Sequence, residues 1–299
     1  GKNMTLDTIL EEIKKAEKIV ILTHIGPDGD AIGSSLAIGY ALEELGKTPD
    51  IIIPEYSKSF AFLPGTDKLK KSTDVEQYDL AISLDCADSK ILKGYSKYFE
   101  NAKTKIVIDH HSSNTMYGDI NFVNPVAPAC SQVLIGMFNY FEIKMKKEMA
   151  TCIMTGIITD TGGFSYGATT ETFEFAADLV RKGAKLKDIC RIALRKKSKA
   201  HCELEKLIYN RLEFLEDGKI AIAYINLEDY ENSMNIEDEN QVYDIYIKDL
   251  NHNIIATIKS NDGETKSIEV VKENIDKFTT KKIILEKDKN ENLYVRQVG

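Results

Sequence analysis

The sequence has little of what marks a membrane, secreted or duplex-DNA-binding protein. No apolar run approaches the about 20 residues that a membrane-spanning helix needs, and the first residues do not resemble a signal peptide. The five cysteines include no Cys-x-x-Cys pair, so we expect reduced thiols in a cytoplasmic protein. The formal net charge of −8 argues against a general duplex-DNA binder, which needs a broad basic face.

The chain has enough apolar material for substantial cores. At 299 residues, of which 43% are hydrophobic, it is long enough for two domains. The pattern turns from alternating strands and helices to helical, and then becomes strand-rich after Gly218. We therefore expect an N-terminal domain at 1–195, a helical connector at 196–217 and a smaller α+β domain at 218–299.

Four short apolar runs, rich in β-branched residues, predict buried strands. They lie at 18–23, 50–53, 80–84 and 105–108. Stretches with helical spacing of apolar residues lie between them. Strands that alternate with helices predict an α/β fold with a parallel, doubly wound sheet, in which all strands end at one edge and ligands bind at that edge.

Acidic and imidazole side chains follow these strands. His24, Asp28 and Asp30 lie in a Gly/Pro turn after the first strand, which is half of a metal site. Asp85 follows the third strand, and Asp109-His110-His111 follow the fourth. A buried helix then leads into Asp160. Because parallel strands share their carboxyl edge, we expect these groups to converge.

The motifs together resemble a known family. In order, they are His24-x-x-Pro27-Asp28-Gly29-Asp30, Asp85, Asp109-His110-His111 and Gly156-Ile157-x-x-Asp160-Thr161-Gly162-Gly163-Phe164. They resemble the DHH phosphoesterase superfamily, most closely its bifunctional oligoribonucleases that also dephosphorylate 3′-phosphoadenosine 5′-phosphate (pAp). The resemblance implies a metal-dependent phosphoesterase acting on short single-stranded oligoribonucleotides or small nucleotides, and it allows a homodimer.

The resemblance also implies a pair of Mn²⁺ ions, with Co²⁺ or Mg²⁺ as alternatives. One ion would be held by His24, Asp28 and Asp85, and the other by Asp30, Asp85, His110 and Asp160. Two divalent cations neutralise an anionic phosphodiester and activate water. Carboxylates with a few imidazoles suit Mn²⁺ better than the thiolate-rich sites typical of zinc.

The family pattern gives roles to further residues. His111 would contact phosphate or protonate a leaving group, and Asp109 would orient a ligand. Substrate contacts are expected from Ser34, Gly162, Gly163 and Lys259. The family's glycine-rich Gly-Gly-Gly-His stretch is missing from the sequence after Gly218. Because that stretch helps to hold the substrate, its loss predicts a preference for small substrates such as pAp over RNA.

Two questions stay open from the sequence. Residues 181–199 hold nine Lys or Arg against one acid, which fits either a solvated helix face or an anion contact. The substrate could instead be pyrophosphate, polyphosphate or a linear dinucleotide. A third alternative is a non-catalytic nucleotide-binding relative.

Overall fold

A computed structural model gives the structure of the protein. It describes residues 1–197, 199–226, 228–229, 232, 244–248, 254–261, 264–270, 283–287 and 293–297. Residue contacts divide the chain into two compact units, Gly1–Lys196 and Lys197–Gly299. The three-part division at 195 and 217 stays a prediction.

The first unit is built on a six-stranded parallel sheet, which confirms the predicted α/β fold class. The strand order is β3-β2-β1-β4-β5-β6. The strands are β1 (Ile19–Thr23), β2 (Asp50–Ile52), β3 (Leu69–Lys70), β4 (Leu80–Leu84), β5 (Thr104–Asp109) and β6 (Ile120–Val123). The sequence did not predict β3 and β6, because one is only two residues long and the other is half-buried along its whole length.

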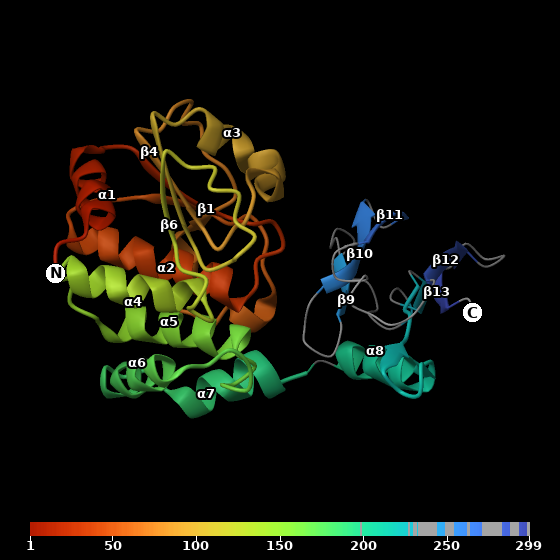
Figure 1. Ribbon diagram of the computed structural model, residues 1–299. Helices are drawn as coiled ribbons and strands as arrows, with labels where there is room; N and C mark the ends of the chain where they lie inside the picture. Colours follow the sequence, from red (N-terminus) through yellow and green to blue (C-terminus); the bar gives the residue numbers. More distant parts are fainter. Residues whose placement is uncertain are drawn as a thin grey trace. The chain divides into compact units, whose positions relative to one another are not determined.

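Helices cover both faces of this sheet (Figure 1). One face is covered by α1 (Met4–Lys15), α2 (Gly29–Glu44) and α4 (Cys130–Tyr140), and α5 (Lys147–Asp160) packs against α2 and α4. The other face carries α3 (Ser96–Glu100) and the 3₁₀ segment η3 (Ser89–Tyr95). Alternate residues of β1 serve the two cores: Ile19 and Ile21 lie in the first, Val20 and Leu22 in the second. This double burial explains why β1 is apolar throughout.

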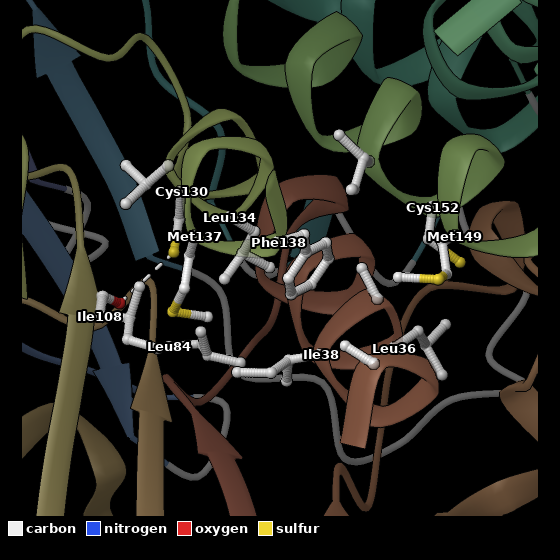
Figure 2. Packing of buried hydrophobic residues seen from close by; sticks show 14 of the residues in the cluster. Leu36, Ile38, Leu84, Ile108, Cys130, Leu134, Met137, Phe138, Met149 and Cys152 are labelled. Atoms are coloured by element: carbon white, nitrogen blue, oxygen red, sulfur yellow. Dashed lines mark hydrogen bonds between the residues drawn. The ribbon is translucent and has the colours of Figure 1, made fainter. Parts of the chain in front are cut away.

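The larger core lies between α2, α4 and the ends of β4 and β5 (Figure 2). Leu84 and Ile108 of the strands pack in one cluster with Leu134 and Phe138 of α4. The Cys130 thiol, at the start of α4, donates a hydrogen bond to the Ile108 carbonyl at 3.3 Å. These contacts place the N-terminus of α4 beside the carboxyl end of β5.

Helices α2 and α5 approach closely because glycine lies at their contact. A Cβ on Gly33 would be 2.4 Å from the Cys152 carbonyl oxygen of α5. A Cβ on Gly156 would be 2.0 Å from the Ser131 hydroxyl and 2.6 Å from Asp30 Oδ1. Gly156 thus leaves the space into which Asp30 fits.

Shorter elements complete the first unit. They are the 3₁₀ turns η1 (Lys58–Phe60) and η2 (Thr66–Lys68), the helices α6 (Thr170–Arg181) and α7 (Leu186–Cys190), and the π-helical turn η4 (Arg191–Arg195). The π-helical turn η4 follows α7 directly in the chain. Among the described residues, no helix is long and apolar enough to cross a membrane.

The second unit begins with α8 (Lys199–Asn210) and continues in antiparallel strands. They are β7 (Glu213–Leu215), β8 (Ile220–Ile222), β9 (Asp244–Lys248), β10 (Ile254–Asn261), β11 (Glu264–Val270), β12 (Ile283–Lys287) and β13 (Leu293–Gln297). β9, β10 and β11 form a three-stranded sheet, while β7–β8 and β12–β13 form two-stranded sheets. The strand-rich region predicted after Gly218 is thus observed in the described segments.

Candidate metal centre

The turn after β1 brings the first group of side chains to the carboxyl edge of the sheet. Asp28 caps α2 by accepting a hydrogen bond from Ala31 N at 2.9 Å. His24 Nε2 lies 3.8 Å from Asp28 Oδ1 and 3.7 Å from Asp85 Oδ2. A helix cap and the end of a strand therefore hold three ligand-type groups around one point.

Asp30, in the first turn of α2, is fully buried and is held by the N-terminus of α4. Its carboxylate accepts hydrogen bonds from Cys130 N at 2.7 Å, from Ser131 N at 2.9 Å and from the Ser131 hydroxyl at 2.6 Å. Burial nevertheless raises the pKa of Asp30 well above its usual value, and the charges of Asp85 and Asp160 raise it further. The carboxylates of this site repel one another.

His110 lies among three of these carboxylates. Its Nε2 is 3.3 Å from Asp85 Oδ1, 3.3 Å from Asp160 Oδ2 and 3.8 Å from Asp30 Oδ2. Burial lowers the pKa of His110, but the nearby Asp160 and Asp85 carboxylates and the charge of Asp30 raise it to about 12. Burial and the charges of Asp28 and Asp85 raise the pKa of Asp160 to about 6, against the opposing effect of His110. The site strongly favours positive charge.

The potential ligand atoms form three overlapping groups, in each of which they lie within 4.8 Å of one another. The groups are His24, Asp28 and Asp85; Asp30, Asp85, His110 and Asp160; and Asp85, Asp109, His110 and His111. Asp85 belongs to all three. The first two groups have the same members as the two ligand sets that the family resemblance implied.

Two buried atoms of the site indicate whether these residues fit a metal. Asp85 Oδ1 and His110 Nε2 are buried and have no hydrogen-bond partner within the described part of the chain. A buried polar atom without a partner is costly, and a cation between carboxylates and imidazoles removes that cost. Oxygen-rich ligation with two imidazoles also matches the preference of Mn²⁺ and Mg²⁺ over that of thiolate-seeking metals. The donor set fits divalent cations.

His111 is oriented differently from His110. Its Nδ1 lies 2.7 Å from Asp109 Oδ1, which leaves Nε2 as the second ring nitrogen on a side chain that is 41% exposed. Burial lowers the pKa of His111, but the hydrogen bond to Asp109 and the charges of Asp85 and Asp109 raise it above its usual value. Asp109 is itself buried, and its Oδ1 also accepts from His110 N at 2.8 Å.

The structure does not bring Ser34 to this edge as a free hydroxyl. Ser34 is fully buried and donates to the Asp30 carbonyl of its own helix at 2.7 Å. The side chain of Lys259, on β10, lies outside the described side chains.

Gly162 and Gly163 lie in the loop after Asp160, with φ of 55° and 70°. Their amides already donate to Thr159 O at 3.3 Å and to Ile158 O at 2.9 Å, so they cap α5. The basic segment at 181–199 also lies beside this loop. A Cβ on Gly163 would be 3.3 Å from Leu194 Cδ1 of η4, which belongs to that segment.

Sequence reasoning missed Ser131 and Asn114, which contact Asp30 and Asp109. Ser131 begins a helix about 100 residues from its partner, and Asn114 lies in a loop whose path no periodicity predicts. Neither has a sequence signal of its own.

The fold and the side chains define a class of protein. It is a doubly wound α/β domain with a cluster of carboxylates and imidazoles at the carboxyl edge of its sheet, where such folds bind ligands. Comparison with known proteins points to a family. Residues 18–157 match the family described as DHH family, N-terminal domain, which confirms the resemblance seen in the sequence.

Two relatives of this chain carry closely related names. It is 34% identical over 187 residues to "Bifunctional oligoribonuclease and PAP phosphatase NrnA" of Thermus thermophilus, covering 60% of this chain and 56% of the relative. It is 26% identical over 260 residues to "Probable bifunctional oligoribonuclease and PAP phosphatase NrnA" of Streptococcus mutans, covering 81% of each. The chain thus spans about half the length of the first of these relatives.

A solved structure is also similar. It is an exopolyphosphatase-related protein from Bacteroides fragilis, with a TM-score of 0.72 and 26% identity, covering 78% of this chain and 72% of that one.

Proposed function

We propose that this protein is a phosphoesterase that uses two divalent metal ions, preferentially Mn²⁺, to release phosphate from pAp and to hydrolyse short oligoribonucleotides. The observation that carries the proposal is the sharing of Asp85 by overlapping ligand groups. One carboxylate that serves two neighbouring groups is what a pair of metals requires. The DHH domain and the named relatives support the same activity.

Each side chain has a defined task in this proposal. His24, Asp28 and Asp85 would hold one ion, and Asp30, Asp85, His110 and Asp160 the other. When bound, the metal pair neutralises the phosphate and activates water. The hydrogen bonds from the start of α4 fix the Asp30 carboxylate, so it does not need to reorganise when it binds a cation.

His111 supplies the proton in this proposal. Asp109 accepts a hydrogen bond from His111 Nδ1–H at 2.7 Å, which aims Nε2 away from Asp109. The neighbours of His111 raise its pKa, which favours the protonated ring, and in this proposal Nε2–H is the proton that goes to the leaving oxygen. The exposed face of the ring gives a substrate access to that atom.

A second candidate substrate is pyrophosphate or an inorganic polyphosphate. It is favoured by the similarity to an exopolyphosphatase-related protein, and the same metal pair would receive it. The cluster of acids and imidazoles does not distinguish the two substrate classes, because both present a phosphate to the metals.

The test is a parallel assay of the manganese-loaded chain with pAp, a four-nucleotide RNA and pyrophosphate, at low and moderate salt. We expect the highest kcat/KM with pAp, a lower value with RNA and the lowest with pyrophosphate. A steep loss of RNA hydrolysis with salt would assign the basic run at 181–199 to RNA binding. Preference for pyrophosphate would favour the second candidate, and hydrolysis of none of the three would contradict the proposal.

A further inference from the structure

Asp85 has a backbone conformation that is uncommon for residues other than glycine. It follows β4 directly, and its φ is 53°, in the left-handed region that glycine favours and that asparagine and aspartate adopt more often than other residues. Such a conformation persists only where surrounding contacts enforce it, and it is common at functional sites. The shared carboxylate of the metal centre thus depends on contacts that hold the Asp85–Cys86 turn.

Two side chains from the loop after the histidines provide these contacts. The Cys86 carbonyl accepts a hydrogen bond from Asn114 Nδ2 at 3.2 Å and another from the Tyr117 hydroxyl at 2.9 Å. On the other side of the turn, Asp85 N donates to the Ile108 carbonyl of β5 at 3.1 Å. The turn is therefore fixed from both sides.

The Asn114 amide has a second partner in the site. The same Nδ2 donates to Asp109 Oδ2 at 2.7 Å, so its two hydrogens connect the ends of β4 and β5. Asp109 uses its other oxygen to hold His111. One amide thus contacts both the turn that carries Asp85 and the carboxylate that orients His111. Tyr117 does not bridge in this way, because its hydroxyl contacts Cys86 O and Ser83 Oγ.

We propose that Asn114 is a positioning residue that sets the Asp85 and Asp109 carboxylates for the metal pair and for His111. The proposal rests on the metal-dependent function proposed above. In this proposal the two N–H groups of the Asn114 amide hold the carboxylates in place. Most metal sites contain hydrogen-bonding partners of this kind, which orient the ligands. The amide oxygen has a separate local role, since it accepts from Met116 N at 2.7 Å and closes an Asx turn.

These two roles are separable by substitution. Asn114→Asp keeps the size of the side chain and the oxygen that closes the turn, but it replaces the donor by an acceptor that faces Asp109. Asn114→Ala removes both roles. Tyr117→Phe is the matched control, because it removes one donor to Cys86 O and leaves the contact with Asp109 intact.

The experiment measures Mn²⁺ binding to the full chain by calorimetry, the EPR spectrum of the bound ions, and kcat and KM for pAp. We expect Asn114→Asp and Asn114→Ala to lose about 10- to 100-fold in Mn²⁺ affinity and in kcat, with little change in KM. The EPR signal of a spin-coupled manganese pair should weaken in both. Tyr117→Phe should change affinity and kcat by less than either, and circular dichroism should show a folded chain in every variant.

The outcomes separate this inference from the function on which it rests. Parent-like or tighter Mn²⁺ binding, together with parent-like kcat, in folded Asn114→Asp would overturn the role of the donor hydrogens. A loss confined to Asn114→Ala would assign Asn114 to the Asx turn alone, and would overturn it as well. If the parent chain itself binds no Mn²⁺, that result contradicts the proposed metal-dependent function, and with it the inference about Asn114.

Discussion

Carboxylates at the two edges of the sheet have different surroundings. At the amino edge, Asp79 accepts hydrogen bonds from Glu17 N at 3.0 Å and Lys18 N at 2.8 Å, and it pairs with Lys103 at 3.2 Å. At the carboxyl edge, Asp85 Oδ1 is buried without a partner among the described residues, and neighbouring carboxylates raise the pKa of Asp30. The hydrogen-bonded and paired Asp79 stabilises the fold, whereas the crowded carboxylates around Asp85 favour the binding of a cation.

The comparison is tested most strongly by Asp85→Asn. We expect phosphate release from pAp to fall by more than about 100-fold, since even residues that only orient metal ligands typically account for 10- to 100-fold. The metal-free variant should remain folded, because asparagine tolerates the left-handed backbone. Activity assays and thermal melts check both halves. Substantial activity in the folded variant with manganese present would contradict the shared role of Asp85.

Removal of metal should act almost as strongly on activity. Chelation should abolish hydrolysis, and Mn²⁺ or Co²⁺ should restore it, whereas Zn²⁺ should restore it poorly because the ligands are mostly oxygens. Chelation should leave contacts at the amino edge, including Asp79 with Lys103, unaffected. Phosphate release after dialysis with each metal is the measurement, and equal rescue by zinc would argue against this ligand set.

Gly156→Ala should have a mixed effect, because it touches both packing and the site. The new Cβ would lie 2.0 Å from Ser131 Oγ and 2.6 Å from Asp30 Oδ1, so one of them must move. Overpacking of this kind costs about 1–3 kcal/mol of unfolding free energy. Displacement of Asp30 should also weaken Mn²⁺ binding. Urea unfolding and metal titration of the same sample measure the two effects, and Gly136→Ala, with no atom within 4 Å of its Cβ, is the control.

Asp79→Asn should give the smallest effect, confined to stability. Hydrogen bonds from Lys18 N and Glu17 N lower the pKa of Asp79 in the folded chain. A lowered folded-state pKa contributes stability above the unfolded pKa of about 3.9, and the contribution disappears as the pH falls through the folded value. We expect a loss of about 1 kcal/mol at neutral pH, with unchanged hydrolysis.

The pH dependence supplies the check on this last variant. The difference in urea midpoint between Asp79→Asn and the parent should shrink as the pH is lowered below about 4, where the parent also becomes neutral at this position. A difference that persists unchanged at low pH would mean that the charge of Asp79 contributes nothing.

The sequence predicts this fold and the meeting of its charged groups for a simple reason. Asp85 follows the buried strand β4, Asp109 ends β5, whose last four residues are buried, and parallel strands must end at one edge. The same argument could not predict the contacts of Ser34. Its position near the start of a helix does not determine whether the hydroxyl faces outward or donates to the helix backbone, as it does here.

The loops limit prediction in the same way. Gly162 and Gly163 are typical of backbone that approaches a phosphate, yet their amides cap α5, and only the path of the loop decides between the two. Asn114 is an ordinary loop asparagine in the sequence. Its contacts with Cys86 and Asp109 arise from the folding of residues 111–117 against the end of β4. Strand ends are set by periodicity, whereas loop contacts depend on tertiary structure.

The central claim is that two cations share Asp85 at the carboxyl edge of the sheet. Anomalous X-ray diffraction at the manganese edge, from crystals of the full chain grown with Mn²⁺, tests it most directly. The account predicts two anomalous peaks, one among His24, Asp28 and Asp85 and the other among Asp30, Asp85, His110 and Asp160. A single peak, or no peak in contact with Asp85, would contradict it.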